Sequence, residues 1–296
     1  MESMLTLHLQ YRPPFETASL LAFLQRRAIP GLEEVVNRCY RRTVLLSRSK
    51  GTIELEPVEQ TNSVQLRLQL NDLSDLNMLV QRCRRLFDLD AVPEAIAGVL
   101  VIDPLLAPLV KARPGLRVPG TIDGFELAVR AIIGQQVSVT GARTLAARLV
   151  AALGEPLDQP HGMLSHFFPT PHALAHSDLQ GLGLTRSRVT ALQALAHAVV
   201  EEGLILDCDT DREQTITRLL QIPGIGPWTT SYVAMRALGD PNAFPATDLG
   251  LRRAFEQQGQ SADSSSIEKR AESWRPWRAY GAHHLWANLI TPLTFS

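Results

Sequence analysis

The sequence predicts an α+β protein in which a small N-terminal domain with an antiparallel sheet precedes a longer helical body. Over residues 5–10 and 64–70, apolar and polar residues alternate, which is typical of strands with one buried face. From residue 92 onward, apolar residues instead recur at helical spacing between loops rich in Gly and Pro. The chain has 296 residues, of which 45% are hydrophobic, so it can bury a core in about two domains of roughly 100–200 residues each.

The N-terminal domain is expected over residues 1–90. Its strand-like runs are interrupted by two segments in which leucine and phenylalanine recur at helical spacing. Such a mixture predicts a small α+β domain built on an antiparallel sheet. The expected strands cover 5–10, 43–47, 52–58 and 64–70, and the expected helices cover 17–29 and 73–87.

Capping residues mark the helices of the body. Asp123 precedes Glu126 by three residues, the spacing of a capping box, ahead of an apolar stripe. Ser138, Thr170 and Thr185 each stand directly before a further helical pattern, and a proline follows Thr170. The body is therefore predicted as a series of capped helices.

Charge and cysteine content bound the function classes. With 29 Lys and Arg against 30 Asp and Glu, the formal net charge is −1, which argues against a polycation that coats nucleic acid but leaves a local anion site open. The six acids within 201–213 are expected in a solvated loop that faces away from any DNA. The three scattered cysteines are Cys39, Cys83 and Cys208, which favours reduced thiols in a cytoplasmic protein.

Targeting and metal signals are also missing from the sequence. The N-terminus lacks the pattern of a signal peptide, and no run approaches the roughly 20 apolar residues of a membrane span. We therefore expect a soluble, cytoplasmic protein that does not bind membranes. The eight histidines show no H-E-x-x-H spacing, so no catalytic metal or other catalytic cofactor is expected.

The segment 218–236 carries the most informative motif. An amphipathic helix ends near Gln221, the residues 223–226 form a tight turn, and a second helix begins near Pro227. Gly224 and Gly226 permit backbone conformations and a close approach that a Cβ would oppose. N–H groups at a helix start form an anion site of the kind that holds a phosphate. Taken alone, the motif is equally compatible with an ordinary helical hairpin.

Asp248 lies 22 residues after Gly226 (248 − 226). By itself, either Thr247 or Asp248 is better explained as the N-cap of the next helix. Trp228 and Tyr232 are four residues apart and share a helix face, and such spacing by itself favours core packing.

The combination resembles the helix-hairpin-helix DNA glycosylases, and within them the bacterial 3-methyladenine DNA glycosylase II family. The resemblance rests on Ile222-Pro-Gly-Ile-Gly-Pro-Trp-Thr-Thr followed by Asp248. Further matches occur in the same order along nearly the whole chain, at 12–15, 85–88, 112–120, 130–139 and 272–280. These segments share no simple composition, so the resemblance is specific.

The resemblance implies an enzyme of base excision repair of alkylation damage. It would flip an alkylated purine (3-methyladenine, 7-methylguanine, with hypoxanthine as a further candidate) out of double-stranded DNA and hydrolyse the N-glycosidic bond, leaving an abasic site. Asp248 matches the catalytic carboxylate, which would stabilise the cationic sugar or assist the attacking water. Trp228 stands where strand-cutting relatives carry a lysine nucleophile, and no lysine occurs between Lys111 and Lys269. A monofunctional glycosylase without lyase activity is implied.

The resemblance also implies the other site residues. Gln136 departs from the family by replacing an apolar wedge, while Thr247 and Leu249 replace an acid and an aromatic beside Asp248. An electron-rich pocket suits cationic alkylated purines, because a cation over an aromatic face gains about 0.5–2 kcal/mol. The implied base-pocket residues are Trp228, Tyr232, Trp286 and Phe23; the implied DNA-backbone residues are Gly224, Gly226 and Thr229; the main-chain carbonyls of Leu220, Ile222 and Ile225 would hold a monovalent cation, Na⁺ or K⁺.

The expected architecture follows from the same resemblance. The helical body would form two lobes, one from residues 91–118 with 241–296 and one from 119–240, the latter containing the hairpin at about 211–238. The cleft between the lobes would hold Asp248, and the protein would act as a monomer. Two alternatives stay open: a non-catalytic hairpin module that binds DNA without needing Asp248, and a glycosylase of the same fold for oxidised purines, against which the missing lysine nucleophile argues.

Overall fold

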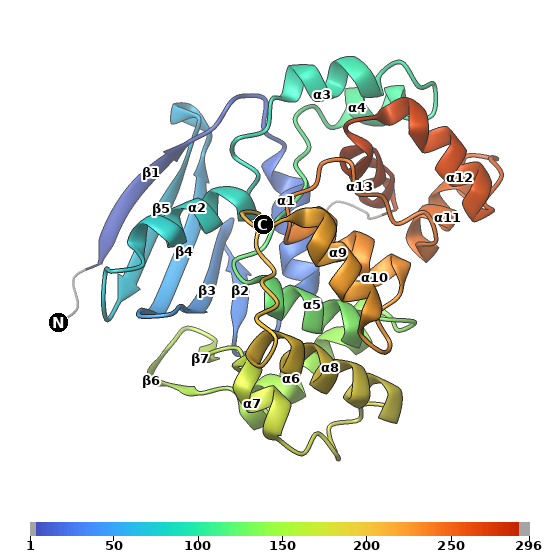
Figure 1. Ribbon diagram of the computed structural model, residues 1–296. Coiled ribbons are helices and arrows are strands. Elements are labelled where there is room, and N and C mark those ends of the chain that lie inside the picture. The colour runs from blue at the N-terminus through green and yellow to red at the C-terminus, as the bar shows by residue number, and fades with distance from the viewer. Residues whose placement is uncertain (1–3, 290–296) are drawn as a thin grey trace.

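A computed structural model describes residues 4–289 of the chain. The N-terminal part is a five-stranded antiparallel sheet with the order β1-β5-β4-β3-β2 (Figure 1). Its strands are β1 (Leu5–Gln10), β2 (Glu33–Val36), β3 (Cys39–Leu45), β4 (Lys50–Val58) and β5 (Ser63–Leu70). The helices α1 (Thr17–Arg27) and α2 (Leu76–Leu86) bury their apolar faces with the sheet in one hydrophobic cluster. The predicted α+β class is confirmed.

One strand of this sheet was not predicted. β2 pairs with β3 through a hairpin whose two turn residues, Asn37 and Arg38, have φ values of 50° and 62°. Positive φ at both positions is the geometry of a tight hairpin turn, which sequence patterns usually signal with glycine. Here arginine occupies the second position, and its guanidinium pairs with Glu59. The hairpin signal was therefore absent, and β3 begins at Cys39, before the predicted start at Thr43.

The helical body follows the predicted caps. Asp123 accepts hydrogen bonds from the first-turn amides of α5, and the side chains of Ser138, Thr170 and Thr185 cap the next three helices. The helices are α3 (Pro93–Leu100), α4 (Ala107–Ala112), α5 (Gly124–Ile133), α6 (Val139–Leu153), α7 (Pro171–His176), α8 (Arg186–Val200), α9 (Arg212–Gln221), α10 (Pro227–Arg236), α11 (Leu249–Gln257), α12 (Ser264–Ala271) and α13 (Arg278–Asn288).

The prediction of an all-helical body is wrong at one place. Residues 156–166 form a small two-stranded sheet, β6 (Pro156–His161) and β7 (Leu164–His166). The amides of Ser165 and His166 donate to the carbonyl of Gly31, so contacts with the N-terminal domain keep this segment extended. Its sequence shows no apolar alternation, and so it carried no strand signal.

Two hydrophobic clusters form the core of the body. The first is built mainly from α5, α6, α7 and α8. The second is built from α3, α4 and α11 to α13, and it also takes in Ala234, Met235 and Leu238 from and just after α10. Because Val233 of the same helix joins the first cluster, α10 is shared by both cores, which brings its residues next to α11 and α13 (Figure 1). Within residues 4–289, no helix is long and apolar enough to cross a membrane.

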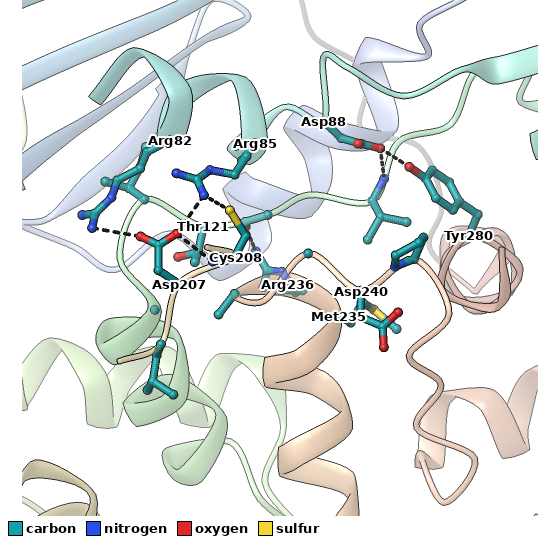
Figure 2. Close-up of a pocket in the computed structure, with 18 residues that line it drawn as sticks. Arg82, Arg85, Asp88, Thr121, Asp207, Cys208, Met235, Arg236, Asp240 and Tyr280 are labelled. Carbon is teal, nitrogen blue, oxygen red and sulfur yellow. Dashed lines mark hydrogen bonds and ion pairs between the residues drawn. The ribbon is translucent and has the colours of Figure 1, made fainter. Parts of the chain in front are cut away.

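The prediction that residues 201–213 form a solvated loop is wrong in its central part. Leu204 and Leu206 are buried, and the Asp207 carboxylate pairs with Arg82 at 3.2 Å and Arg85 at 2.7 Å. These ion pairs attach the segment to α2 beside a cavity of about 220 Å³ (Figure 2). The partners are more than 120 residues away, so local composition could not reveal them.

The opposite side of this cavity holds a buried carboxyl group. Asp88 accepts hydrogen bonds from the Tyr280 hydroxyl at 2.8 Å and the Val118 amide at 3.2 Å (Figure 2). Burial raises the pKa of Asp88 to about 7, against the lowering effect of Tyr280 and Arg117. None of the residues lining this cavity belongs to the predicted catalytic, pocket or DNA-binding set.

Candidate active site

The hairpin lies where the sequence predicted it, between α9 and α10. Gly224 has a φ of 84°, and a Cβ there would lie 2.8 Å from the Cβ of Ala191 in α8. Glycine is thus required both by the backbone and by the close packing of α8. Gly226 is different, because its backbone is extended and a Cβ would meet no atom within 4 Å. The space beside Gly226 is therefore open to a ligand.

The start of α10 leaves main-chain donors without a side-chain cap. Gly226 is the N-cap and Pro227 the first helical residue; within the described chain, no side chain caps this end. The first-turn N–H groups of a helix have no intrahelical acceptor. They also lie at the positive end of the helix dipole, so this end suits a phosphate oxygen.

Gln135 braces the hairpin against the loop between α5 and α6. Its side-chain amide donates to the Gly224 carbonyl and to the Thr229 hydroxyl, both at 2.9 Å, while Arg188 donates to its main-chain carbonyl. Gln136, the predicted wedge, follows directly in this loop with a φ of 56° and an exposed side chain. No role was predicted for Gln135 from the sequence, although this residue lies in the matched segment 130–139.

Thr229, predicted to contact the DNA backbone, has a buried side chain. It is 2% exposed, and its hydroxyl accepts the Gln135 amide. The hydroxyl is thus used inside the protein, and a phosphate contact at this position is left to the main-chain N–H. The DNA-backbone contact predicted for Thr229 stays a prediction.

Asp248 is held by three N–H donors. Its Oδ1 accepts from the Trp286 indole at 2.8 Å and from the Leu251 amide at 2.9 Å, and its Oδ2 accepts from the Trp228 indole at 2.8 Å. The bond from Leu251 makes Asp248 the N-cap of α11. The N-cap interpretation is therefore correct, and it coexists with two indole contacts that a simple cap does not need.

Three of the predicted base-pocket aromatics, Trp228, Tyr232 and Trp286, lie close to one another beside this carboxylate. The rings of Trp228 and Tyr232 stack with centroids 5.5 Å apart and an angle of 9°, and Tyr232 lies 6.4 Å from Trp286. Gly250 was not predicted as a site residue, yet a Cβ there would lie 2.8 Å from Asp248 Oδ1 and 3.1 Å from Trp286 Nε1. Only glycine leaves this carboxylate and indole undisturbed.

Phe23, predicted as a further wall of the base pocket, is covered by arginine side chains in this structure. Phe23 is 3% exposed, and the guanidinium groups of Arg27 and Arg236 lie 3.8 Å and 4.9 Å from its ring centroid. Arg236 also lies 5.4 Å from the Tyr232 centroid and donates to its hydroxyl at 2.7 Å. The protein's own cations thus already occupy faces of these two rings.

These cations also change the chemistry of Tyr232. Burial by itself raises the pKa of the Tyr232 hydroxyl, but Arg236 and Arg27 outweigh it and hold that pKa below its ordinary value. Thr247 and Leu249, the two residues beside Asp248 that differ from the pattern of the resembled family, lie at the surface. Thr247 is exposed, and Leu249 is 57% exposed.

Comparison with known proteins identifies the family. A family model described as "HhH-GPD superfamily base excision DNA repair protein" matches residues 129–279. The chain belongs to this superfamily. A second model, described as "AlkA N-terminal domain", matches residues 6–123. The family predicted from the hairpin and Asp248 is therefore confirmed.

Two relatives of this HhH-GPD chain match it over nearly its whole length. It is 43% identical to "Probable bifunctional transcriptional activator/DNA repair enzyme AlkA" of Mycobacterium tuberculosis, over 97% of this chain and 58% of that protein. It is 34% identical to "DNA-3-methyladenine glycosylase 2" of Escherichia coli, over 94% of this chain and 95% of that protein. The chain thus spans just over half the length of the first relative.

A solved structure shares the fold. The 3-methyladenine DNA-glycosylase from Archaeoglobus fulgidus superposes with a TM-score of 0.80 at 24% identity, covering 95% of this chain and 97% of that one. The arrangement of a sheet followed by a helical body is thus shared with that protein.

Within the described part of this HhH-GPD chain, two places offer ligand atoms for a metal. In the hairpin, the Ile222 carbonyl accepts from the Ile225 amide at 3.1 Å, and a carbonyl oxygen retains a second lone pair, so the predicted Na⁺ or K⁺ site stays a prediction. Elsewhere, ligand atoms of Asp207, Cys208 and Asp209 lie within 4.8 Å of one another. Arg85 already pairs with both of these carboxylates, so a positive charge is present there without any ion.

Proposed function

We propose that the chain is a monofunctional DNA glycosylase that releases alkylated purines from double-stranded DNA, with Asp248 as the catalytic carboxylate. The observation that carries the proposal is the pair of indole N–H bonds that hold both oxygens of Asp248 beside stacked aromatic rings. An N-cap needs only the bond from Leu251. The two tryptophans therefore point to a task for the carboxylate beyond capping.

The chemistry follows from where charge develops. As the C1′–N bond breaks, the base leaves with the bonding electrons and the sugar becomes cationic; water then adds to C1′ and loses a proton. A fixed carboxylate stabilises such a cation without reorganising during the reaction. Since each Asp248 oxygen already accepts an N–H, we assign Asp248 mainly this electrostatic role. Oδ2, with one donor, retains a lone pair for the attacking water.

Strand cleavage through a covalent enzyme–DNA intermediate is not part of the proposal. That chemistry needs an amine nucleophile, and the residue after the hairpin is Trp228. The three lysines are Lys50 on β4, Lys111 on α4 and Lys269 on α12. The Asp248 cluster, formed by Asp248 with Trp228 and Trp286, is instead built from α10, α11 and α13. We infer that the product is an intact strand with an abasic site.

DNA is proposed to bind along the hairpin and the loop before α6. The first-turn N–H groups of α10 would hold a backbone phosphate, and Gln136 would fill the gap left by the flipped base. Gln135 links these two segments through Gly224 and Thr229, so the phosphate contact and the wedge would move as one unit. We propose that one copy of the chain suffices, since these residues and Asp248 all belong to it.

The test is release of free base from methylated duplex DNA under single-turnover conditions, comparing the parent with Asp248→Asn. Asparagine remains a good N-cap, so the helix is preserved while the charge is removed. Asp263→Asn is the matched control, because Asp263 caps α12 through Ser266 in the same way. We expect release by the parent and the control, and loss of release in Asp248→Asn with duplex binding retained.

Other outcomes select other functions. If the parent binds duplex DNA but releases no base, the chain is a non-catalytic hairpin module. Release from duplexes containing 8-oxoguanine in preference to methylpurines would instead assign it to oxidised purines. Equal release by the parent and Asp248→Asn would keep the glycosylase and exclude Asp248 as its catalytic group. Capture of a covalent adduct with borohydride would contradict the monofunctional assignment.

A further inference from the structure

The hydroxyl group of Tyr232 is held by an arginine that is itself fixed in place. Arg236 donates from Nη1 to the Tyr232 hydroxyl at 2.7 Å. Its Nε and Nη2 donate to the carbonyls of Pro119 and Gly120, at 2.8 Å and 2.9 Å. Three hydrogen bonds leave this guanidinium little freedom to rotate, so the Tyr232 oxygen lies beside a fixed positive charge.

The bond from Arg236 also determines where the hydroxyl proton of Tyr232 can point. A guanidinium carries only donors, so the Tyr232 oxygen accepts from it and directs its own proton elsewhere. Among residues 4–289, Tyr232 makes no hydrogen bond as a donor. The side chain is partly exposed, so this O–H donor is available to a ligand that reaches the ring.

Arg27 brings a second positive charge close to Tyr232. Its guanidinium lies 3.8 Å from the Phe23 ring centroid, and that of Arg236 lies 4.9 Å from the same centroid. Arg27 Nη1 is buried without a hydrogen-bond partner in the described part of the chain. Burial raises the pKa of the Tyr232 hydroxyl, but Arg236 and Arg27 outweigh it and hold that pKa below its ordinary value. A more acidic phenol donates stronger hydrogen bonds, above all to an atom that is gaining negative charge.

Tyr232 is connected to Asp248 through both tryptophans of the candidate site. Its ring stacks on Trp228 with centroids 5.5 Å apart and lies 6.4 Å from the ring of Trp286. Both indoles donate to the Asp248 carboxylate. A nucleotide with its sugar at Asp248 would extend its base toward these rings, so the base is the part of the substrate that Tyr232 can reach.

The charge that develops on a departing base depends on the base. 7-Methylguanine is cationic in DNA, so it becomes neutral when it takes the electron pair of the C1′–N9 bond. Hypoxanthine is neutral in DNA and leaves as an anion, with its charge spread over the ring nitrogens and the carbonyl oxygen. A donor aimed at one of these atoms assists the neutral base more, because the hydrogen bond strengthens as the negative charge grows.

We propose that Tyr232 donates a hydrogen bond to the departing base and that Arg236 positions its hydroxyl, which extends release to neutral purines such as hypoxanthine. The inference rests on the proposed glycosylase function and adds a catalytic contact on the base side of the bond, whereas Asp248 acts on the sugar. As the C1′–N9 bond breaks, both electrons pass to the base, and the bond from Tyr232 stabilises them. Water adds to C1′, the released base takes its proton from water, and the phenol keeps its own.

The experiment measures single-turnover release from two duplexes, one with a single hypoxanthine and one with a single 7-methylguanine, with enzyme in saturating excess. Tyr232→Phe keeps the ring and removes only the hydroxyl. We expect hypoxanthine release to slow about 10- to 150-fold, the effect of losing a hydrogen bond to a charged group. Release of 7-methylguanine should slow by a smaller factor, so the ratio of the two rates should fall at least about fivefold.

The control and the positioning variant use the same ratio. Tyr280→Phe is the matched control, because the Tyr280 hydroxyl donates to Asp88 at 2.8 Å outside the candidate site; it should keep the ratio of the parent. Arg236→Lys should lower the ratio, because an ammonium group lacks the planar fork that makes the three bonds. Circular dichroism spectra that match the parent's would show that each variant is folded.

The ratio separates a contact with the base from a role in packing. A ring needed only for packing would change both rates by the same factor, so an unchanged ratio in Tyr232→Phe would exclude the proposed bond. An unchanged ratio in Arg236→Lys would remove the positioning role of Arg236. Release of 7-methylguanine but not of hypoxanthine by the parent would overturn this inference and leave the glycosylase in place, whereas release of neither base would overturn both.

Discussion

The two tryptophans that hold Asp248 donate to different oxygens of its carboxylate. We therefore expect their replacement to slow base release to different extents. Trp228 is the donor to Oδ2, whereas Oδ1 receives both Trp286 and the Leu251 amide. Trp228→Phe therefore leaves one carboxylate oxygen without its indole bond, while Trp286→Phe leaves Oδ1 with a remaining donor. Phenylalanine keeps an aromatic ring in each place, so the change is chiefly the loss of an N–H.

The magnitude follows from the energy of a hydrogen bond to a charged group. Such a bond contributes about 1.5–3 kcal/mol, and about 1.4 kcal/mol corresponds to a factor of ten in rate. If the bond keeps Asp248 aimed at the sugar, Trp228→Phe should slow base release by about 10- to 150-fold. Trp286→Phe should have a smaller effect.

The assay is single-turnover release of 7-methylguanine with enzyme in saturating excess, so that weaker DNA binding does not enter the rate. Trp274→Phe is the matched control, because the Trp274 indole donates to the Asp103 carboxylate at 2.7 Å outside the candidate site. That variant should lose thermal stability without slowing release. Parent-like rates in both site variants, or a slower rate in Trp286→Phe than in Trp228→Phe, would refute the reasoning.

The remaining predictions separate fold, DNA binding and pH dependence. Gly224→Ala should lower the unfolding free energy by at least the roughly 1–2 kcal/mol that a residue with a Cβ loses in a left-handed backbone conformation, because the new Cβ would also contact Ala191. An unchanged urea midpoint would contradict this. Gly226→Ala, whose Cβ meets open space, should unfold like the parent but bind duplex DNA more weakly by fluorescence anisotropy; equal affinity would remove the phosphate contact proposed there. The pKa of Asp88 is raised from 3.8 to about 7, so between these pH values the folded state holds a proton that the unfolded chain releases, and stability falls as pH rises. At about 1.4 kcal/mol per pH unit this amounts to at most about 4 kcal/mol, and Asp88→Asn should remove that slope in urea titrations at pH 4, 5.5 and 7.

Local chemistry made much of the fold predictable from the sequence. The caps at Asp123, Ser138, Thr170 and Thr185 were found because a capping side chain and its target amide are neighbours in the chain. The β2–β3 hairpin was missed because Arg38 has a positive φ, and a turn of this kind is usually recognised in a sequence by a glycine at that position. The β6–β7 pair was missed for a different reason. Its extended backbone depends on contacts with residues that are distant in the sequence, such as Gly31.

The sequence predicted which residues form the candidate site, but not how their side chains are arranged. The motif and the resemblance brought Trp228, Asp248 and Trp286 together, yet the indole bonds join residues 20 and 38 positions apart, and no sequence rule predicts which atoms meet. The covering of Phe23 by Arg27 and Arg236 could not be foreseen either. Burial of arginine against aromatic rings depends on how α1 and α10 meet, and this is set by the cores of two different parts of the chain.

The geometry of α10 links DNA binding to the orientation of Asp248. Gly226, the proposed phosphate contact, and Trp228, the donor to Asp248 Oδ2, are two residues apart and flank Pro227. The proline ring fixes φ at its own position, so the N–H groups of this first turn and the indole belong to one stiff segment. A phosphate bound at this turn would therefore immobilise the tryptophan that fixes Oδ2. α10 also joins both hydrophobic cores of the body, so the packing that aligns the carboxylate also forms the turn proposed to bind phosphate. A substitution in either core that shifts α10 should therefore impair DNA binding and base release together.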